Sequence, residues 1–337
     1  MAQDGSNTSV SRRTLLGAGL AAIAAGGLPR AAHAAAPSPS GAARRVLRFA
    51  HPTDIHVQPE LRGGEGMAAA FRHMMALDEP PELIITGGDL PMDTASTPEE
   101  TSRVQWDLFQ RVLRETVPAS VPIYHTLGNH DIFGRDKKAC RATGEEAVYG
   151  RKWFLQNFGY EKTWQSFDRA GWHFVILDSI DLLPDGDEYV CRIRGEQLDW
   201  LRRDLASTAL PTVVVSHVPI ISAASFFDSD DDEWVSDAPD LKVSTKRTHA
   251  DCRELEELFF RHPHVRLCLS GHLHQLARSE YNGVTYISEG AVCGAKWKGP
   301  KRRTPEGYGI IDLYDDGTFR HQYMTFGWKA ETRKKKG

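Results

Sequence analysis

The sequence has few cysteines, no large excess of either charge and no long hydrophobic run. Its 337 residues include five cysteines, which form neither a close pair nor a CxxC motif. This odd, scattered count argues against a disulfide framework and against a zinc knuckle. Lysine and arginine total 41 against 45 aspartate and glutamate residues, for a formal net charge of -4. A dedicated nucleic-acid-binding protein would carry a strongly basic face, so we expect no nucleic-acid partner.

Hydrophobic residues make up 41% of the chain and charged residues 26%, which is the balance of an ordinary globular protein. This composition excludes a collagen, a coiled coil and a disordered chain. The N-terminal apolar stretch, residues 14–28, is shorter than the roughly 20 residues that a bilayer-spanning helix needs. We therefore expect no stable membrane span.

The N-terminal stretch instead has the parts of a signal peptide. Arg12 and Arg13 precede it, and the small-residue cleavage pattern Ala32-His33-Ala34 follows it. A generic secretory signal would show the same parts, but the arginine pair directly before the apolar stretch resembles a twin-arginine signal. We predict a signal peptide over residues 1–34, export by the twin-arginine translocation machinery, and a location in the periplasm, the cell envelope or the medium. The Pro-, Ser- and Ala-rich residues 35–44 predict a flexible lead-in.

Short apolar runs alternate with helical patterns along the rest of the chain. The run Thr97-Pro98-Glu99-Glu100 predicts a helix with Thr97 as its N-cap and Pro98 at its first position. Helical spacing predicts two further helices over 195–205 and 251–260, and an Asp315-Asp316-Gly317 turn predicts a β-hairpin over 308–325. The apolar runs are typical of buried strands in a sheet covered on both faces; they are 46–50, 83–86, 121–124, 174–177, 212–215 and 265–269. This alternation predicts an α/β domain with its chemistry at the strand ends.

Polar motifs follow five of the predicted strands. In chain order they are Asp54-Ile55-His56, Gly87-Gly88-Asp89, Gly128-Asn129-His130-Asp131, Ser216-His217 and Gly271-His272-Leu273-His274. Each motif alone is weak evidence, but together they supply imidazole, carboxylate and amide groups without a thiolate. This set suits two divalent or trivalent ions of Mn, Fe, Zn or a similar metal, and not a structural zinc. The candidate ligands are seven, too many for one ion and enough for two: Asp54, His56, Asp89, Asn129, His217, His272 and His274.

The order of these motifs resembles the calcineurin-like metallophosphoesterase superfamily, over residues 46–290. The resemblance implies a four-layer α/β/β/α sandwich of two mixed sheets, in a domain of residues 45–328 that includes the hairpin and precedes a basic tail over 329–337. It implies that a first metal ion is held by Asp54, His56, Asp89 and His274. It also implies that Asp89 bridges to a second ion, held by Asn129, His217 and His272.

The same resemblance gives His130 and Asp131 catalytic roles. It implies that His130 lies beside the scissile phosphate and is not a ligand, and that Asp131 orients the His130 ring. The residues support the first point, because neighbours in an extended segment point opposite ways and Asn129 would take the ion. Two metal ions about 3.5–4 Å apart supply a hydroxide and hold phosphate oxygens for in-line attack, and His130 can then protonate the leaving group. We predict an exported phosphoester hydrolase with no covalent phosphoenzyme.

The substrate class stays open between a phosphodiester and a phosphomonoester. The spacing Gly88-Asp89-Leu90-Pro91-Met92-Asp93 resembles bacterial cyclic-nucleotide phosphodiesterases and slightly favours a diester. Met92 stands where purple acid phosphatases have a metal-binding Tyr, and Leu127 stands where protein Ser/Thr phosphatases have an Arg, which disfavours both groups. A catalytically silent metal-binding envelope protein is a further alternative, although the presence of both His130 and Asp131 favours catalysis.

A basic cluster follows the last motif, with Lys296, Lys298, Lys301, Arg302 and Arg303 around Trp297. Such a cluster is more often a solvated loop than a binding site for a second phosphate or an anionic tail. Trp297 could stack on a base or sugar, but a packing role is more common. We therefore expect a solvated loop with a buried tryptophan.

Overall fold

The computed structural model of the chain describes residues 41–184, 188–228 and 243–331, all within one unit, Ala34–Gly337. The predicted signal peptide (1–34) lies outside the described residues, as do residues 35–40 of the lead-in and 332–337 of the basic tail. Within the described ranges, the structure contains no helix with the length and apolar character that crossing a membrane requires.

The first of two large sheets joins the beginning of the domain to its end. Its strand order is β13 (Phe319–Thr325), β12 (Gly307–Tyr314), β1 (Arg45–His51), β2 (Leu83–Thr86) and β3 (Ile123–His125). Strands β1, β2 and β3 are parallel, with Ala50 opposite Ile84 and Ile84 opposite Ile123. Strand β12 runs antiparallel to β1 and forms a hairpin with β13. The hairpin places the C-terminal strands at one side of the sheet.

The second sheet has six strands. Their order is β10 (Ala277–Tyr281), β11 (Val284–Ser288), β9 (Val265–Ser270), β8 (Thr212–Ser216), β5 (Trp172–Leu177) and β4 (Gln165–Arg169). The four inner strands are parallel, and β10 and β4 pair antiparallel at the two edges. A small two-stranded sheet, β6 (Ile180–Leu182) with β7 (Tyr189–Cys191), lies apart from both.

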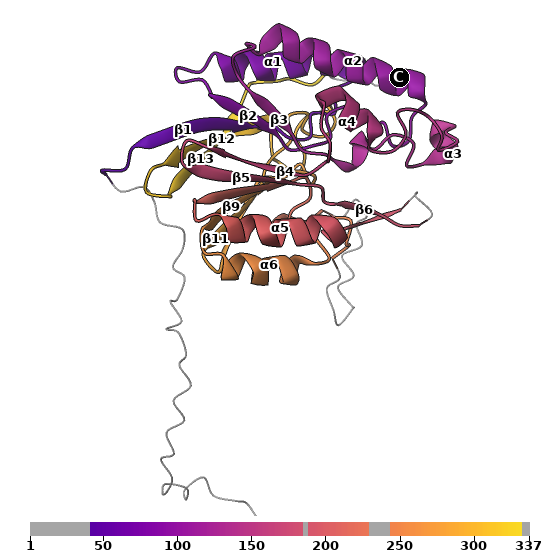
Figure 1. The fold of residues 1–337 in the computed structure, drawn as a ribbon. Coiled ribbons are helices and arrows are strands. Elements are labelled where there is room, and N and C mark those ends of the chain that lie inside the picture. Colours follow the sequence, from indigo (N-terminus) through magenta and orange to yellow (C-terminus); the bar gives the residue numbers. More distant parts are fainter. Residues whose placement is uncertain (1–40, 185–187, 229–242, 332–337) are drawn as a thin grey trace, which may run out of the picture. The chain divides into compact units, whose positions relative to one another are not determined.

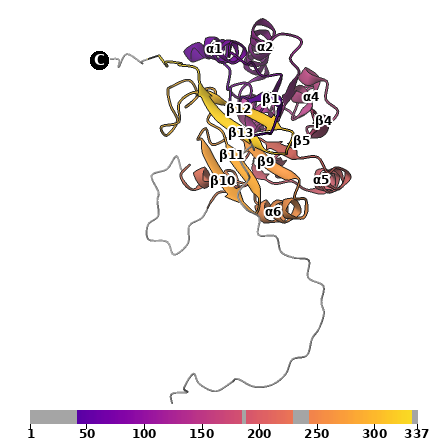
Figure 2. The ribbon, with the colours of Figure 1, turned by 90° about the vertical axis from the view of Figure 1, so that its left-hand side faces the viewer.

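Helices cover the outer faces of the two large sheets. Helices α1 (Gly63–Met75) and α2 (Glu99–Thr116) lie over the first sheet, and α5 (Gly195–Ser207) and α6 (Cys252–Arg261) lie over the second (Figure 1). Figure 2 shows the same order of layers from the side. Shorter elements connect the layers: η1 (Glu60–Arg62), η2 (Asn129–Asp131), α3 (Lys137–Cys140), α4 (Lys152–Phe158) and η3 (Ala223–Phe226). The predicted sandwich of two mixed sheets between helices is confirmed.

The strands read as continuous apolar runs because both of their faces are buried. Successive side chains of a strand point to opposite faces. In β1, Phe49 packs between the two sheets, whereas Ala50 packs under α1 and α2. In β5, Phe174 joins the core between the sheets and Val175 joins the core under α5 and α6. Phe49 and Phe174 meet edge to face at 5.6 Å across the sheet interface.

Helix α2 differs from its expected form in two details. It begins at Glu99 instead of Pro98, and Thr97 contacts the Ser102 hydroxyl instead of capping the helix. Its buried face carries Trp106 and Phe109, whereas Val104 is 51% exposed. The larger aromatic side chains remove more apolar surface from water than Val104 would, which sets the rotation of the helix.

Candidate metal centre

The five polar motifs come together at the ends of five strands. Asp54 follows β1, Asp89 follows β2, Asn129 follows β3, His217 follows β8 and His272 follows β9. Within the first sheet the Asp54 N–H donates to the Gly88 carbonyl at 3.0 Å, and across the two sheets the His272 N–H donates to Oδ2 of Asp54 at 2.8 Å. Loops from both sheets therefore form a single site.

Five of the seven candidate ligands have a left-handed backbone, which is uncommon outside glycine. These are Asp54, His56, Asp89, His272 and His274, with φ between 44° and 69°. The motifs Asp54-Ile55-His56 and His272-Leu273-His274 share one geometry. In each, the apolar residue between the two left-handed residues is buried. Such backbone strain persists where the surrounding structure holds it, and it is typical of functional sites.

The first half of the centre consists of Asp54, His56, Asp89 and His274. Nε2 of His274 lies 3.2 Å from Oδ1 of Asp54, and Nε2 of His56 lies 3.5 Å from Oδ2 of Asp89. The other Asp54 oxygen, Oδ2, accepts from the Thr53 hydroxyl and the His272 N–H. Oδ1 of Asp54 is buried and has no hydrogen-bond partner among the described residues. This oxygen is free to bind a cation.

The second half is centred on His217. Its Nε2 lies 3.2 Å from each of three atoms: Oδ2 of Asp89, Oδ1 of Asn129 and Nδ1 of His272. Ligand atoms about 2.1 Å from one ion lie roughly 3.0–3.4 Å from one another. The spacing in this half therefore fits a metal ion. Oδ2 of Asp89 faces both halves, as a bridging carboxylate would.

Backbone carbonyls fix the protons of the four histidine rings. A carbonyl oxygen only accepts, so the ring nitrogen beside it must carry a hydrogen, and the opposite nitrogen, which faces the centre, is the one that can bind a cation. The pairs are His56 Nδ1 with Met92 at 3.0 Å, His217 Nδ1 with Gly87 at 2.7 Å, His274 Nδ1 with Gly294 at 2.5 Å and His272 Nε2 with Lys246 at 2.7 Å. These rings are oriented as metal ligands are.

The charges of the centre shift the pKa values of its rings in opposite directions. Burial opposes a charge on His217, but the neighbouring Asp89 carboxylate raises the pKa of His217 to about 9. Burial lowers the pKa of His272 to about 4, and the charge on His217 adds to this effect. A metal ion between these groups would take the place of the His217 proton, so the donor set fits a cation.

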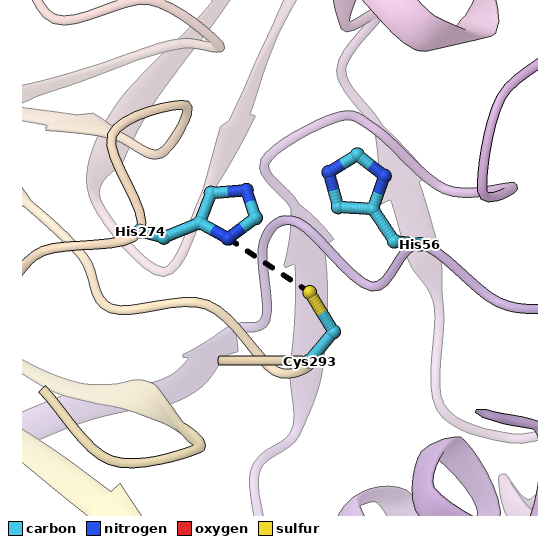
Figure 3. A group of neighbouring side chains, drawn as sticks. All are labelled: His56, His274 and Cys293. Carbon is cyan, nitrogen blue, oxygen red and sulfur yellow. Dashed lines mark hydrogen bonds between the residues drawn. The ribbon is translucent and has the colours of Figure 1, made fainter. Parts of the chain in front are cut away.

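Cys293 is a third buried side chain beside His56 and His274 (Figure 3). Its Sγ lies 3.9 Å from Nδ1 of His274, on the side of the ring that donates to the Gly294 carbonyl. The other ring nitrogen of His274 faces Asp54. Cys293 therefore lies behind a candidate ligand and does not face the predicted ions.

Asp131 does not orient His130, contrary to our expectation. Its two oxygens accept from the backbone N–H groups of Gly128, Asp89 and Leu90, so its carboxylate holds two of the ligand loops together. The carboxylate beside the His130 ring is Asp93, whose Oδ1 lies 3.2 Å from Nδ1 of His130.

Asp93 ends the motif that resembles cyclic-nucleotide phosphodiesterases, but the sequence assigns it no role. Burial opposes its ionisation, yet contact with the His130 ring lowers the pKa of Asp93 to about 2. The spacing from Asp89 to Asp93 was the available signal. This signal is weak, because Asp131 directly follows His130 in the sequence and competes with Asp93 for the same role.

The backbone at Asn129 also differs from the expected extended segment. Asn129–Asp131 forms the short 3-10 helix η2, so the argument from alternating side chains was wrong at this point. Asn129 nevertheless reaches His217, while the backbone N–H of His130 donates to Oδ1 of Asp89 at 2.8 Å. The His130 ring is 20% exposed and lines a cavity of about 540 Å³ next to the centre.

The family profile of the calcineurin-like phosphoesterases matches residues 47–276, more than half of the chain. The chain belongs to this family. The protein is therefore a metal-dependent phosphoester hydrolase, as predicted. Enzymes of this family use divalent metals. Among the described residues, three groups have the spacing to hold a metal ion: His56 with Asp89 and His130, Asp89 with His217 and His272, and His56 with His274 and Cys293.

Two curated relatives cover most of the chain. The chain is 28% identical over 287 residues to a probable cyclic nucleotide phosphodiesterase of Synechococcus sp., covering 82% of this chain and 91% of the relative. It is 25% identical over 288 residues to a 3',5'-cyclic-nucleotide phosphodiesterase of Nostoc sp., covering 81% and 90%. The crystal structure of a dimetal phosphatase from Danio rerio shares the fold, with 14% identity, a TM-score of 0.54 and coverage of 84% of this chain and 100% of that chain.

Proposed function

We propose that this enzyme hydrolyses small phosphodiesters at a centre of two metal ions. The observation that carries the proposal is the position of Asp89, whose Oδ2 faces His56 in one half and His217 in the other. The first ion would be held by Asp54, His56, Asp89 and His274. The second would be held by Asp89, Asn129, His217 and His272.

Bound metal ions would lower the pKa of a water molecule, supply the attacking group and hold the phosphate oxygens. The protein's own contribution to bond cleavage is the His130–Asp93 pair. Oδ1 of Asp93 lies 3.2 Å from Nδ1 of His130. A proton on Nδ1 would face this carboxylate, and Nε2 would then be the nitrogen that carries a proton to the leaving oxygen. His130 would thus act as the general acid, and Asp93 would position it.

A diester is the substrate class that the comparisons support. Both curated relatives above are named as cyclic nucleotide phosphodiesterases. The test is hydrolysis of bis(p-nitrophenyl) phosphate against p-nitrophenyl phosphate, by metal-loaded protein and with Mn²⁺ omitted as the control. We expect faster turnover of the diester, only with metal. Faster turnover of the monoester would make the enzyme a phosphomonoesterase, and no turnover of either would favour a catalytically silent metal-binding envelope protein.

We also propose that the protein is exported by the twin-arginine route. The support is the pair Arg12-Arg13 before a weak apolar stretch. Replacement of both residues by lysine should retain the full-length chain in the cytoplasm, as measured by cell fractionation, whereas Arg30→Lys should not. Continued export of the double variant would contradict the proposal.

A further inference from the structure

Basic side chains gather at the cavity that opens beside the metal centre. Lys246 and Arg247 come from the segment before α6, and Lys296, Lys298 and Lys301 come from the loop between β11 and β12. The same cavity is lined by candidate ligands and by the general acid; these are His56, Asp89, Asn129, His130, His272 and His274. Two segments far apart in sequence therefore bring positive charge to one face of the site.

Three of these cations have acidic neighbours. Lys246 forms an ion pair with Glu188. Nε of Arg247 lies 3.7 Å from Oδ2 of Asp228, and Nζ of Lys301 lies 3.9 Å from Oδ1 of the same carboxylate. Two carboxylates, Glu188 and Asp228, thus partly compensate the charges of these three cations.

Lys296 and Lys298 differ from the other three. No ion pair joins either of them to a carboxylate among the residues that the structure describes. Trp297, between them, is 1% exposed, and its indole N–H donates to the His56 carbonyl at 2.8 Å. The Trp297 backbone N–H donates to the Cys293 carbonyl at 2.7 Å. The two lysines are thus held on a fixed loop, anchored to a candidate metal ligand.

The loop also has an unusual backbone. Lys296 and Trp297 are consecutive non-glycine residues with φ of 54° and 66°, a conformation that persists only where the surrounding structure holds it. The expected packing role of Trp297 is confirmed, and it explains this strain. The expected solvated loop is only part of the description, because Lys296 is half-buried and both lysines line the cavity.

A simple phosphodiester does not need these two lysines. It carries one negative charge, and two divalent ions already exceed the charge of the Asp54 and Asp89 carboxylates. Further cations at the same cavity suit a substrate with a second anionic group. Ammonium groups bind phosphate through short, charge-assisted hydrogen bonds.

We infer that Lys296 and Lys298 bind a second phosphate on the substrate, away from the ester that is cleaved. The substrate class is a small phosphodiester that also carries a phosphomonoester group. This inference rests on the proposed phosphodiesterase function. It names the part of the substrate that the loop recognises.

A matched pair of chromogenic diesters tests the inference. The substrates are the p-nitrophenyl ester of a thymidine monophosphate, with and without a second phosphate on the free sugar hydroxyl. Metal-loaded wild-type protein should show a kcat/KM about tenfold higher for the substrate with two phosphates. The double variant Lys296→Gln, Lys298→Gln should bring this ratio close to one. The control is Arg303→Gln, which removes a positive charge from the same loop. Arg303 does not line the cavity, so this variant should keep the wild-type ratio of kcat/KM values.

Binding gives a second readout that does not depend on turnover. By calorimetry, metal-loaded wild-type protein should bind thymidine bisphosphate about tenfold more tightly than thymidine monophosphate, and the double variant should bind both alike. The inference would be overturned if wild-type protein bound the two nucleotides equally tightly. It would also be overturned if the double variant still bound thymidine bisphosphate more tightly. Turnover of both substrates at equal rates would do the same and leave the phosphodiesterase function intact. No turnover of either would count against that function instead.

Discussion

At the scale of single residues, Asp89 is the one side chain among the described residues that contacts both halves of the centre. Its two oxygens have separate tasks: Oδ1 accepts from the His130 backbone N–H at 2.8 Å, and Oδ2 faces His56 and His217. Contact with His217 lowers the pKa of Asp89 well below its usual range even though burial opposes this. The Asp89 carboxylate is therefore negatively charged at neutral pH and can bind cations.

The substitution Asp89→Asn tests the bridging role. An amide can keep the hydrogen bond to His130, but it loses the charge and the second oxygen that the ions share. We expect fewer than two metal ions per chain by elemental analysis, together with loss of turnover. Asp199→Asn changes an exposed carboxylate of α5 and should retain both ions. Two ions retained in Asp89→Asn would show that this residue does not bridge.

The pairing of Asp93 with His130 makes a separate prediction. His130→Asn should keep its metal and lower kcat by roughly 10²–10⁴, with a smaller loss for p-nitrophenolate, which leaves without a proton. Asp93→Asn should lower kcat in the same leaving-group-dependent way but by less, because it acts through the ring. Asp131→Asn should instead lower metal content, because its carboxylate ties the ligand loops. Equal losses on all leaving groups would contradict the general-acid assignment.

At the scale of secondary structure, the elements that build the site could be predicted and the backbone at the site could not. Strands β1, β2, β8 and β9 are apolar runs buried on both faces, and each ends at a polar residue, so their positions follow from the pattern. The left-handed conformations of Asp54 and His272 have no such signal, since tertiary contacts impose them. The edge strand β10 was missed because it is largely exposed and its sequence, ARSEY, is mostly polar.

Helix α1 offers a test of how an element supports the site. Gly66 lies against the Trp297 ring, and a Cβ there would come 2.2 Å from Cζ3. Alanine favours a helix by about 1 kcal/mol, but the overlap with a buried ring should cost more, so we expect Gly66→Ala to lower the free energy of unfolding by about 1–3 kcal/mol. In the same helix, Gly64→Ala meets only the flexible end of Leu108 at 3.0 Å. Denaturant unfolding should show little change for Gly64→Ala, and equal effects of both variants would disprove this account.

At the scale of the whole domain, the sandwich depends on contacts between layers as well as on the three apolar cores. His173 on β5 lies between two carboxylates, with Nδ1 2.6 Å from Oδ1 of Asp168 and Nε2 2.9 Å from Oδ2 of Asp204. Asp168 belongs to the neighbouring strand β4 and Asp204 belongs to α5. A charged His173 ring therefore connects the edge of the second sheet to the helix that covers it.

The stability of the domain should follow the charge on this ring. Burial opposes the charge, but the hydrogen bonds to Asp204 and Asp168 prevail and raise the pKa of His173 above its ordinary value. The folded protein thus binds this proton more tightly than the unfolded chain, whose histidines titrate near about 6.5. The stabilisation is complete below that pH and is lost as the pH rises through the raised pKa of the folded state.

We therefore expect the free energy of unfolding of the metal-loaded protein to fall between neutral and mildly alkaline pH. The metal-loaded form is used because a bound ion takes the place of the second proton on a site histidine. The histidines of the metal centre then do not add to the pH dependence. His173→Gln should remove this slope and lower stability most at acidic pH, as measured by denaturant unfolding across the pH range. His262→Gln changes a histidine whose pKa burial lowers, so its unfolding curve should keep the wild-type slope above neutral pH. A slope unchanged in His173→Gln would mean that the charge on this ring does not stabilise the contact between β5 and α5.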